Sequence, residues 1–262
     1  FAGDEDLVDL VWTDRPALSC EPLWELEPKF AGYTRAEKLE KVREKMNELG
    51  ADVFVIPALD EIAWLLNLRG GDVLYTPVFL SYLLLERGKA TLCVQKEAVS
   101  AEIEAHLAAD GVALAPYDDI YPLVASLPKG TRVLLDGERA NYRITQSVGT
   151  GVETIDRPSP IQLMKAMKHP VEQENERIAH IRDGVAVTRF IYWLKHTIGK
   201  ETITEMSAAK KLESLRAEGE RAVVFENVIV RSGKGHDMEV HIDTDEANAI
   251  AMRGTPMMEV LP

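Results

Sequence analysis

The feature that most constrains this chain is the alternation of helix-like and strand-like segments between residues 34 and 156. Thr34 and Glu37 form a capping box for a helix that ends at Gly50, and a buried strand, DVFVI, follows at 52–56. Further strands are expected at 79–86, 90–95, near 112, 132–135 and 153–155, and further helices at 97–109, 120–126 and 140–147. Such an alternation with short links predicts an α/β fold with a mostly parallel sheet flanked by helices.

A second, helical region follows the proline-rich segment 157–160. Pro170 suits the first position of a long helix that ends at Gly199. The apolar residues expected on its buried face are Ile178, Ile181, Val185, Ile191 and Leu194. Shorter helices are expected at 161–167 and from a capping box of Thr202 and Glu205 to about residue 217.

These breaks divide the chain into three expected parts. Residues 1–32 read as a linker or the end of a preceding domain, because prolines disfavour helices and central strands there. Residues 33–157 form the α/β domain. Residues 158–262 form an incomplete domain that begins with helices, and from about residue 219 the pattern changes from helical to strand-like and then acidic.

Composition excludes several classes of partner. Acidic residues outnumber basic ones by 43 to 30, and the net charge of −13 argues against nucleic acid and anionic membranes as partners. Cys20 and Cys93 lack the spacing of a zinc site and are expected to be reduced, as in a cytoplasmic protein. The chain begins at Phe1 without a methionine or a signal peptide, so we expect a piece of a longer protein.

The most distinctive segment is ALDEIAWLLNLRGGDVLYTPVFLSYLL at 58–84. An apolar stretch there gives way to a polar turn with two adjacent glycines, which allow a tight loop. Arg69 and Asp72 would either present a fixed charge pair to a ligand or form a structural salt bridge at a surface turn. If the turn binds a substrate, Arg69 and Asp72 are the first candidates and Tyr75 is the next.

This segment resembles the creatinase-like region of cytosolic, three-domain Xaa-Pro aminopeptidases. The resemblance runs in order through five segments: VDLVWTDRP (8–16), FAGYTRAEKLEKVREKM (30–46), the 58–85 region, SPIQLMKAMKHPVEQENERIAHIRDGVAV (159–187) and TITEMSAAKKLESLRAE (202–218). It implies that a creatinase-like α/β domain is followed by the start of a "pita-bread" catalytic domain.

The same resemblance implies a chemistry and its cofactors. Members of the family are cytoplasmic homodimers that remove the residue preceding proline from peptides, using water bridged by two divalent ions, usually manganese. Their metal ligands are two aspartates, one histidine and two glutamates. These ligands are not recognisable here, except that RAVVFENVIV (221–230) would place one ligand at Glu226. The chain itself is therefore expected to lack catalysis.

The tail after residue 218 contains one candidate metal-binding site. Its acidic and imidazole side chains alternate with apolar ones, which would place them on one face of a strand. They are Asp237, Glu239, His241, Asp243 and Asp245. This face is either a divalent-cation site or the solvated side of a surface strand.

A second class of function stays open. The creatinase-like fold also occurs in histone-chaperone domains without metals, so the chain would then be a non-catalytic peptide- or protein-binding module. The close match around Asn67–Asp72 favours the peptidase.

Overall fold

The computed structural model describes residues 7–217. Contacts within the chain divide it into two compact units, Phe1–Lys168 and His169–Pro262. The expected boundary at 157 therefore lies before α8 (Pro160–Ala166), the last helix of the first unit.

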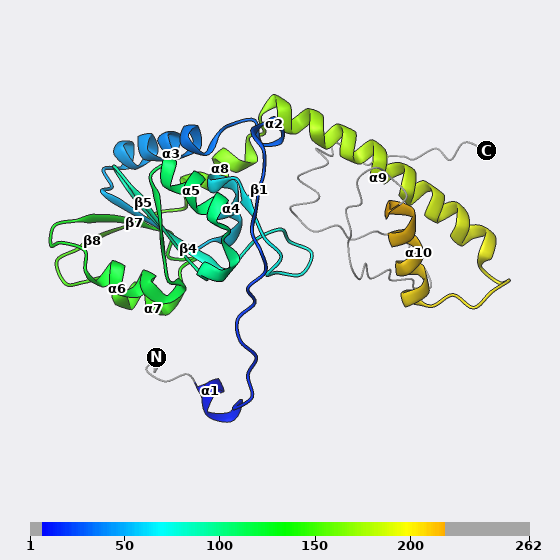
Figure 1. Cartoon of the computed structure of the whole chain (residues 1–262), viewed down its shortest axis with the longest axis horizontal. Coiled ribbons are helices and arrows are strands. Elements are labelled where there is room, and N and C mark those ends of the chain that lie inside the picture. Colours follow the sequence, from blue (N-terminus) through cyan, green and yellow to red (C-terminus); the bar gives the residue numbers. More distant parts are fainter. Residues whose placement is uncertain (1–6, 218–262) are drawn as a thin grey trace. The chain divides into compact units, whose positions relative to one another are not determined.

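The first unit is a layered α/β structure (Figure 1). Its helices are α1 (Leu7–Val11), α2 (Pro28–Ala31), α3 (Arg35–Leu49), α4 (Leu59–Leu66), α5 (Ala101–Ala109), α6 (Ile120–Ala125), α7 (Tyr142–Ser147) and α8 (Pro160–Ala166). Two 3-10 turns are η1 (Lys96–Ala98) and η2 (Tyr117–Asp119). Its strands are β1 (Trp24–Glu25), β2 (Val53–Ile56), β3 (Leu68–Arg69), β4 (Ser81–Glu86), β5 (Ala90–Val94), β6 (Val112–Ala115), β7 (Arg132–Leu135) and β8 (Glu153–Asp156).

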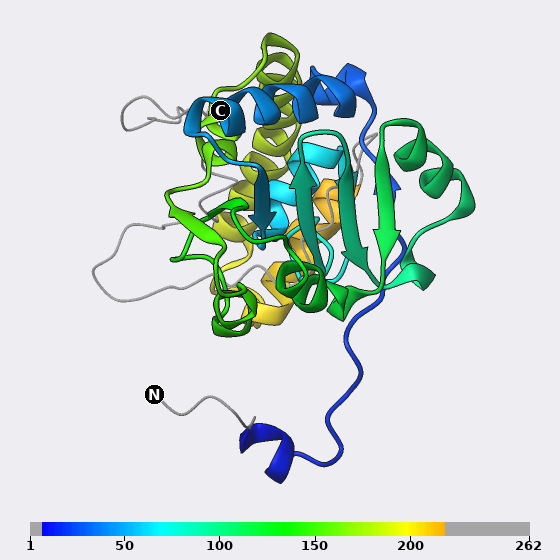
Figure 2. The same cartoon turned by 90° about the vertical axis from the view of Figure 1, so that its left-hand side faces the viewer.

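Six of these strands form one sheet in the order β6-β5-β4-β2-β7-β8 (Figure 2). Strand β4 is antiparallel to both of its neighbours, while β2, β7 and β8 are mutually parallel and β5 is parallel to β6. The predicted mostly parallel sheet is confirmed. Within this six-stranded sheet, every strand except β4 ends at the same side, which we call the carboxyl edge; the opposite side is the amino edge.

Both faces of the sheet are covered, with α3 and the α6–α7 pair on opposite sides (Figure 1). In β2, Phe54 and Ile56 join the core beneath α3, α4, α5 and α8, while Val53 and Val55 join the core beneath α6 and α7. This follows from the two-residue period of a strand, since successive side chains point to opposite faces. The all-apolar sequence of β2 is thus explained by burial on both sides.

Of the two capping boxes predicted from the sequence, the structure contains one. The capping box of Thr34 and Glu37 at the start of α3 is confirmed. The box of Thr202 and Glu205 is wrong, because α10 (Glu205–Ala217) begins at Glu205 and Thr204 exchanges hydrogen bonds with Ser207 instead. Helix α1 was also not expected; it ends before the first proline of its segment.

The second unit contains α9 (Pro170–Thr197) and α10, which pack together. The predicted long helix is confirmed, but its buried face is partly wrong. Ile181 and Val185 are 70% and 56% exposed, whereas Ala186 and Phe190 are buried against α10. Apolar residues occur around much of this helix, so periodicity alone did not decide which side α10 covers.

Among the residues described, no helix combines the length and the apolar character needed to cross a membrane. Helix α9 spans 28 residues but carries charged side chains along its length.

Candidate functional site

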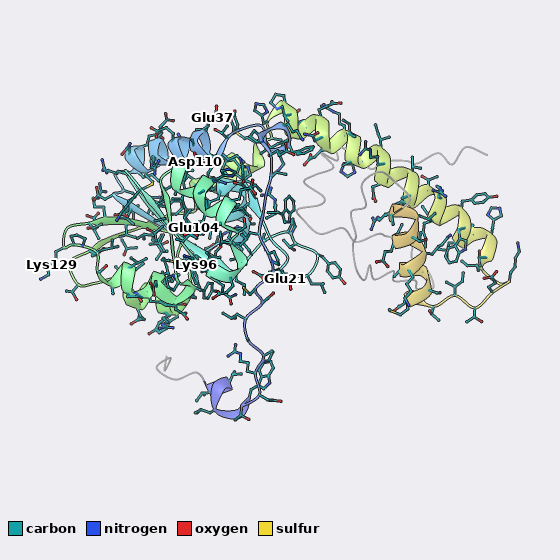
Figure 3. All side chains as sticks on the ribbon, in the orientation of Figure 1. Glu21, Glu37, Lys96, Glu104, Asp110 and Lys129 are labelled. Atoms are coloured by element: carbon teal, nitrogen blue, oxygen red, sulfur yellow. The ribbon has the colours of Figure 1, made fainter. Side chains whose placement is uncertain are left out.

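The Gly70–Leu80 loop lies at the carboxyl edge, immediately before β4. Asp72 fixes its base: one carboxylate oxygen accepts the Glu21 N–H at 2.9 Å and the other accepts the Leu80 N–H at 2.8 Å. Glu21, on the segment that precedes β1, is labelled in Figure 3. The carboxylate therefore joins the two ends of the loop region to a distant part of the chain.

Arg69 has different partners. Its guanidinium donates to the carbonyls of Ala63 and Leu68 at 2.8 and 2.9 Å, at the end of α4. Carbonyls at a helix C-terminus lack partners within the helix, and a cation there is favourable. Arg69 thus donates to main-chain carbonyls and Asp72 accepts from main-chain N–H groups, while their contact with a substrate stays a prediction.

The loop's backbone is tightly constrained. A Cβ added at Gly70 would lie 2.7 Å from the Phe79 Cβ, so the close approach of these two segments requires glycine. Tyr75 has a φ of 66°, a left-handed conformation that is uncommon for an aromatic residue. Leu74 and Tyr75 at the tip are 62% and 42% exposed. The loop is thus held at its base by Asp72 and exposes an apolar tip to solvent.

A cluster of tyrosines lies beside this loop at the carboxyl edge. Tyr82 is the second residue of β4, and its ring centroid is 5.1 Å from that of Tyr117 and 6.0 Å from that of Tyr121. The amide of Asn141 donates to the Tyr82 hydroxyl at 2.9 Å. Arg143 stacks on the Tyr121 ring at 3.9 Å. Aromatic faces and hydroxyl groups thus occur together at this edge.

Burial raises the pKa of all three hydroxyls in the cluster. For Tyr121, burial and the hydrogen bond with Tyr82 raise the pKa to about 12. For Tyr117, burial is the main cause, and the negative charge of Asp72 adds to it. The hydroxyls are therefore neutral near pH 7 and are able both to donate and to accept hydrogen bonds.

A buried polar network occupies the ends of β2, β7 and β8. Glu61 at the start of α4 is 1% exposed, and its carboxylate accepts the Ser159 hydroxyl at 2.6 Å. Asp136 accepts the Ser159 N–H at 3.1 Å, and Arg139 lies 3.3 Å from Glu61. Lys165 pairs with Asp60 beside them. This network holds the start of α8 against the sheet.

Burial raises the pKa of Glu61 despite the opposing Ser159 hydrogen bond and the Arg139 charge. A carboxyl with a raised folded-state pKa contributes stability fully below its unfolded pKa and loses it as the pH rises through the folded pKa. We therefore expect Glu61→Gln, which resembles the neutral form, to gain stability relative to the wild type as the pH rises from about 4 to about 7. Urea unfolding at several pH values measures this, with Glu44→Gln at an exposed position as the control; a stability difference that does not change with pH would contradict it.

Within residues 7–217, no group of three or more His, Cys, Asp or Glu side chains is arranged to hold a metal ion. Glu226, the ligand implied by the resemblance, lies outside the described residues, as does the acidic face of Asp237, Glu239, His241, Asp243 and Asp245. The described residues do not fit a dinuclear metal centre.

The family assignment comes from a direct match. The family model of the creatinase/prolidase N-terminal domain matches residues 14–172, more than half of the chain. The chain belongs to this creatinase/prolidase N-terminal domain family. The predicted resemblance to Xaa-Pro aminopeptidases is confirmed by its relatives.

Two fungal relatives carry the name "Probable Xaa-Pro aminopeptidase P". The chain is 36% identical to the one from Neurospora crassa over 229 residues, covering 83% of this chain and 34% of that protein. It is 34% identical to the one from Sclerotinia sclerotiorum over 257 residues, covering 94% of this chain and 43% of that protein. The chain spans between a third and a half of the length of these relatives.

Solved structures agree with this relationship. An X-prolyl aminopeptidase from Caenorhabditis elegans, described as a cytosolic enzyme with a di-nuclear active site, matches with a TM-score of 0.75 and 30% identity over 82% of this chain and 36% of that chain. A Xaa-Pro dipeptidase from Bacillus anthracis, at 12% identity and a TM-score of 0.51 over 71% of this chain and 50% of that chain, shares the fold.

A second family model, that of phosphate propanoyltransferase, matches residues 172–253. This match covers less than half of the chain and includes the tail beyond residue 217. The Sclerotinia alignment also extends into the tail, since 94% of 262 residues do not fit before residue 219. Both matches therefore include part of the tail.

The Gly70–Leu80 loop was predicted from the sequence, but the side chains that surround the carboxyl edge were not. The tyrosine cluster and the Glu61 network were not predicted. One available signal was the position of Asp136 directly after a buried strand, because ligands and polar networks collect at the carboxyl ends of parallel strands. The tyrosines gave no signal, since they come from segments far apart in the sequence.

Proposed function

We propose that this chain is the substrate-supporting part of a Xaa-Pro aminopeptidase, which hydrolyses the bond before proline at the N-terminus of peptides. The observation that carries the proposal is the Gly70–Leu80 loop at the carboxyl edge of a creatinase/prolidase-type domain, which Asp72 holds at its base and which exposes Tyr75 at its tip. In this proposal Tyr75 contacts the peptide, while Arg69 and Asp72 act as positioning residues that hold the loop.

The organisation of the parent protein is part of the proposal. Residues 1–32 are the linker from a preceding domain, 33–157 the creatinase-like domain, and 158–262 the beginning of a pita-bread catalytic domain with a divergent tail. The parent is a cytoplasmic homodimer with two divalent metal ions, manganese being the expected identity. Two findings support this proposal. The chain spans between a third and a half of the length of its relatives, and the Caenorhabditis elegans enzyme is described with a di-nuclear active site.

The chain alone is proposed to bind such peptides without cleaving them. We expect Ala-Pro-Ala to bind more tightly than Ala-Ala-Ala in a titration followed by NMR, because proline has an apolar ring that suits an aromatic edge. With added Mn²⁺ we expect no release of the first alanine, since the described residues contain no metal-binding cluster. Equal binding of the two peptides would contradict the substrate role, and measurable turnover would contradict the lack of catalysis.

The alternative is a non-catalytic peptide- or protein-binding module of the same fold. Sequencing the gene on both sides of this segment would distinguish the alternative from the peptidase. A reading frame that continues into recognisable metal ligands after Glu218 favours the peptidase, whereas a natural stop near Pro262 favours the binding module.

A further inference from the structure

The segment 19–26, which we call the strap, runs across the first unit without a helix and contains β1 (Figure 1). Main-chain hydrogen bonds hold it at two points. The Leu23 N–H donates to the Ala98 carbonyl at 2.9 Å, and the Leu26 N–H donates to the Asn67 carbonyl at 2.8 Å. Between these points β1 pairs with β3 over two residues, and Leu23 is the one buried residue of the strap. A segment with so few buried contacts opens more readily than the sheet does.

Glu25 anchors the strap through its side chain. One carboxylate oxygen lies 2.5 Å from the Arg35 guanidinium on α3, and the other lies 2.7 Å from Nδ1 of His106 on α5. The carboxylate thus joins the strap to two helices at once. Arginine keeps its charge in proteins, whereas a histidine ordinarily changes its charge between about pH 5 and pH 8. Of the two contacts, the one with His106 therefore responds to pH.

The surroundings of His106 accept a positive charge on its ring. No other histidine precedes residue 169 in the sequence, so this is the one imidazole of the first unit. Acidic groups outnumber basic ones on the elements around it. Besides Glu25, these charged groups are Glu102, Glu104 and Asp110 on or next to α5, Lys96 on η1, Glu27 and Lys29 beside the strap, and Arg35 on α3.

Glu25 stays ionised over the range in which histidines change charge. Burial opposes its ionisation, but the hydrogen bonds from His106 and Arg35, and their charges, outweigh burial and lower the pKa of the carboxyl. A protonated histidine donates a charge-assisted hydrogen bond to such a carboxylate. A neutral ring offers an uncharged hydrogen bond, and only in the tautomer with a proton on Nδ1. The contact is therefore strongest in mild acid and weakens as the pH rises.

We infer that His106 is a pH-responsive attachment point for the strap: the protonated ring fastens Glu25 to α5, and loss of the proton loosens the strap. A histidine that gains an acidic partner on folding contributes stability that is complete while it is protonated and is lost as the pH rises. Because Glu25 keeps its contact with Arg35, the strap opens more often rather than detaching. The Glu21 N–H that donates to Asp72 lies on the same strap, so the segment that loosens is one that supports the base of the Gly70–Leu80 loop.

This inference does not depend on the proposed function, because it concerns the attachment of the strap and involves no peptide. The two proposals therefore fail separately. A chain that binds no Xaa-Pro peptide is still expected to have a pH-dependent strap, and a strap that ignores pH leaves peptide binding untouched.

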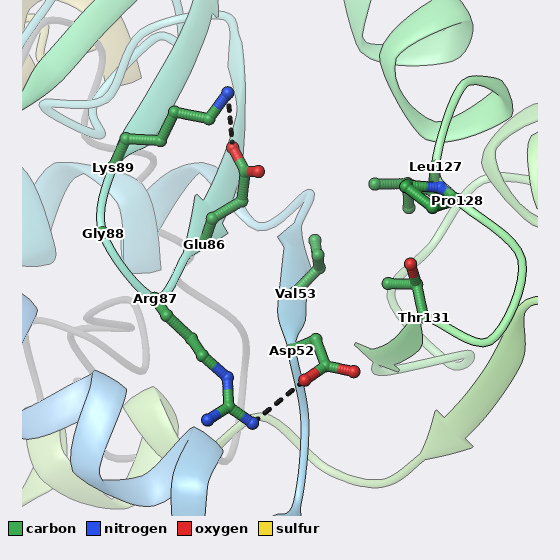
Figure 4. A pocket seen from close by; sticks show the side chains of 9 residues that line it. All are labelled: Asp52, Val53, Glu86, Arg87, Gly88, Lys89, Leu127, Pro128 and Thr131. Atoms are coloured by element: carbon green, nitrogen blue, oxygen red, sulfur yellow. Dashed lines mark hydrogen bonds and ion pairs between the residues drawn. The ribbon is translucent and has the colours of Figure 1, made fainter.

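The test is amide hydrogen exchange of the 262-residue chain, followed by NMR at about pH 5.5 and about pH 8, with each rate divided by the intrinsic rate at that pH. We expect protection of the Leu23 and Leu26 amides to fall by about two- to fivefold between the two pH values, roughly the effect of an exposed ion pair. The control is the Glu86 amide, which donates to the Lys89 carbonyl at 2.9 Å in the turn that lines the pocket shown in Figure 4, at the amino edge of the sheet. Its protection should not change. Equal changes at all three amides, or none at Leu23 and Leu26, would overturn the inference.

Two substitutions fix the charge at position 106. His106→Gln is neutral and His106→Lys is charged at both pH values, and the position is exposed on a helix, where glutamine and lysine are both favourable. We expect the low protection of the strap at both pH values in His106→Gln and the high protection in His106→Lys. Glu102→Gln, one turn earlier on α5, is the matched control and should keep the wild-type change. A pH dependence of the Leu23 and Leu26 amides that survives in His106→Gln would show that another group controls the strap.

Discussion

Replacing Arg35 by alanine is expected to destabilise the first unit by about 3–5 kcal/mol, the range for removing one partner from a buried ionic network. Arg35 is 7% exposed. Its guanidinium donates to the Leu66 carbonyl at 2.7 Å and pairs with Glu25 and with Asp110, which is labelled in Figure 3. Without it, the end of α4 loses a donor and two carboxylates lose their common cation.

Urea unfolding followed by circular dichroism measures this change. Arg87→Ala is the matched control, because Arg87 also pairs with a carboxylate but is largely exposed; its loss should cost at most about 1 kcal/mol. Similar losses for the two variants would show that the Arg35 network is not a main source of stability.

The second large effect is expected from Asp72→Ala. Two main-chain donors, Glu21 N–H and Leu80 N–H, would lose a charged acceptor. Hydrogen bonds to charged groups contribute roughly 1.5–3 kcal/mol each, so we expect a loss of about 3 kcal/mol in local stability. The loop should open more often, and amide hydrogen exchange at Leu80 should accelerate about a hundredfold, the factor that corresponds to roughly 3 kcal/mol.

Asp118→Ala is the control for this change, since Asp118 is an exposed aspartate on η2, near the same edge. Its removal should leave exchange at Leu80 unchanged. An Asp72→Ala variant with wild-type exchange at Leu80 would mean that the loop is held in another way.

Much of the fold was predictable because its signals are local. The helix 35–49 carries its own cap and stop, and β2 is a short apolar run between turn residues. Helix α9 shows the limit of such signals. Its start at Pro170 was predicted, but its buried face depends on α10, which packs on Ala186 and Phe190 rather than on Ile181 and Val185.

The site was predictable only in part. The two glycines and Asp72 marked a constrained loop, but the partner of Asp72 lies 51 residues earlier in the sequence. The Tyr82 hydroxyl meets Tyr121 and Asn141 across 39 and 59 residues. Contacts of this kind depend on the topology of the whole sheet and leave no short motif, so the sequence around Asp72 does not reveal them.

The central claim is that the Gly70–Leu80 loop presents Tyr75 to a peptide with proline in the second position. The direct measurement is the affinity of the chain and of two variants for Ala-Pro-Ala, with Tyr142→Ala as the control, because Tyr142 and Tyr75 are 48% and 42% exposed. We expect Tyr75→Ala to weaken binding by about tenfold, the effect of losing about 1.4 kcal/mol of contact. Tyr142→Ala should bind like the wild type. Equal affinities of the two variants would contradict the assignment of Tyr75 as the contact residue.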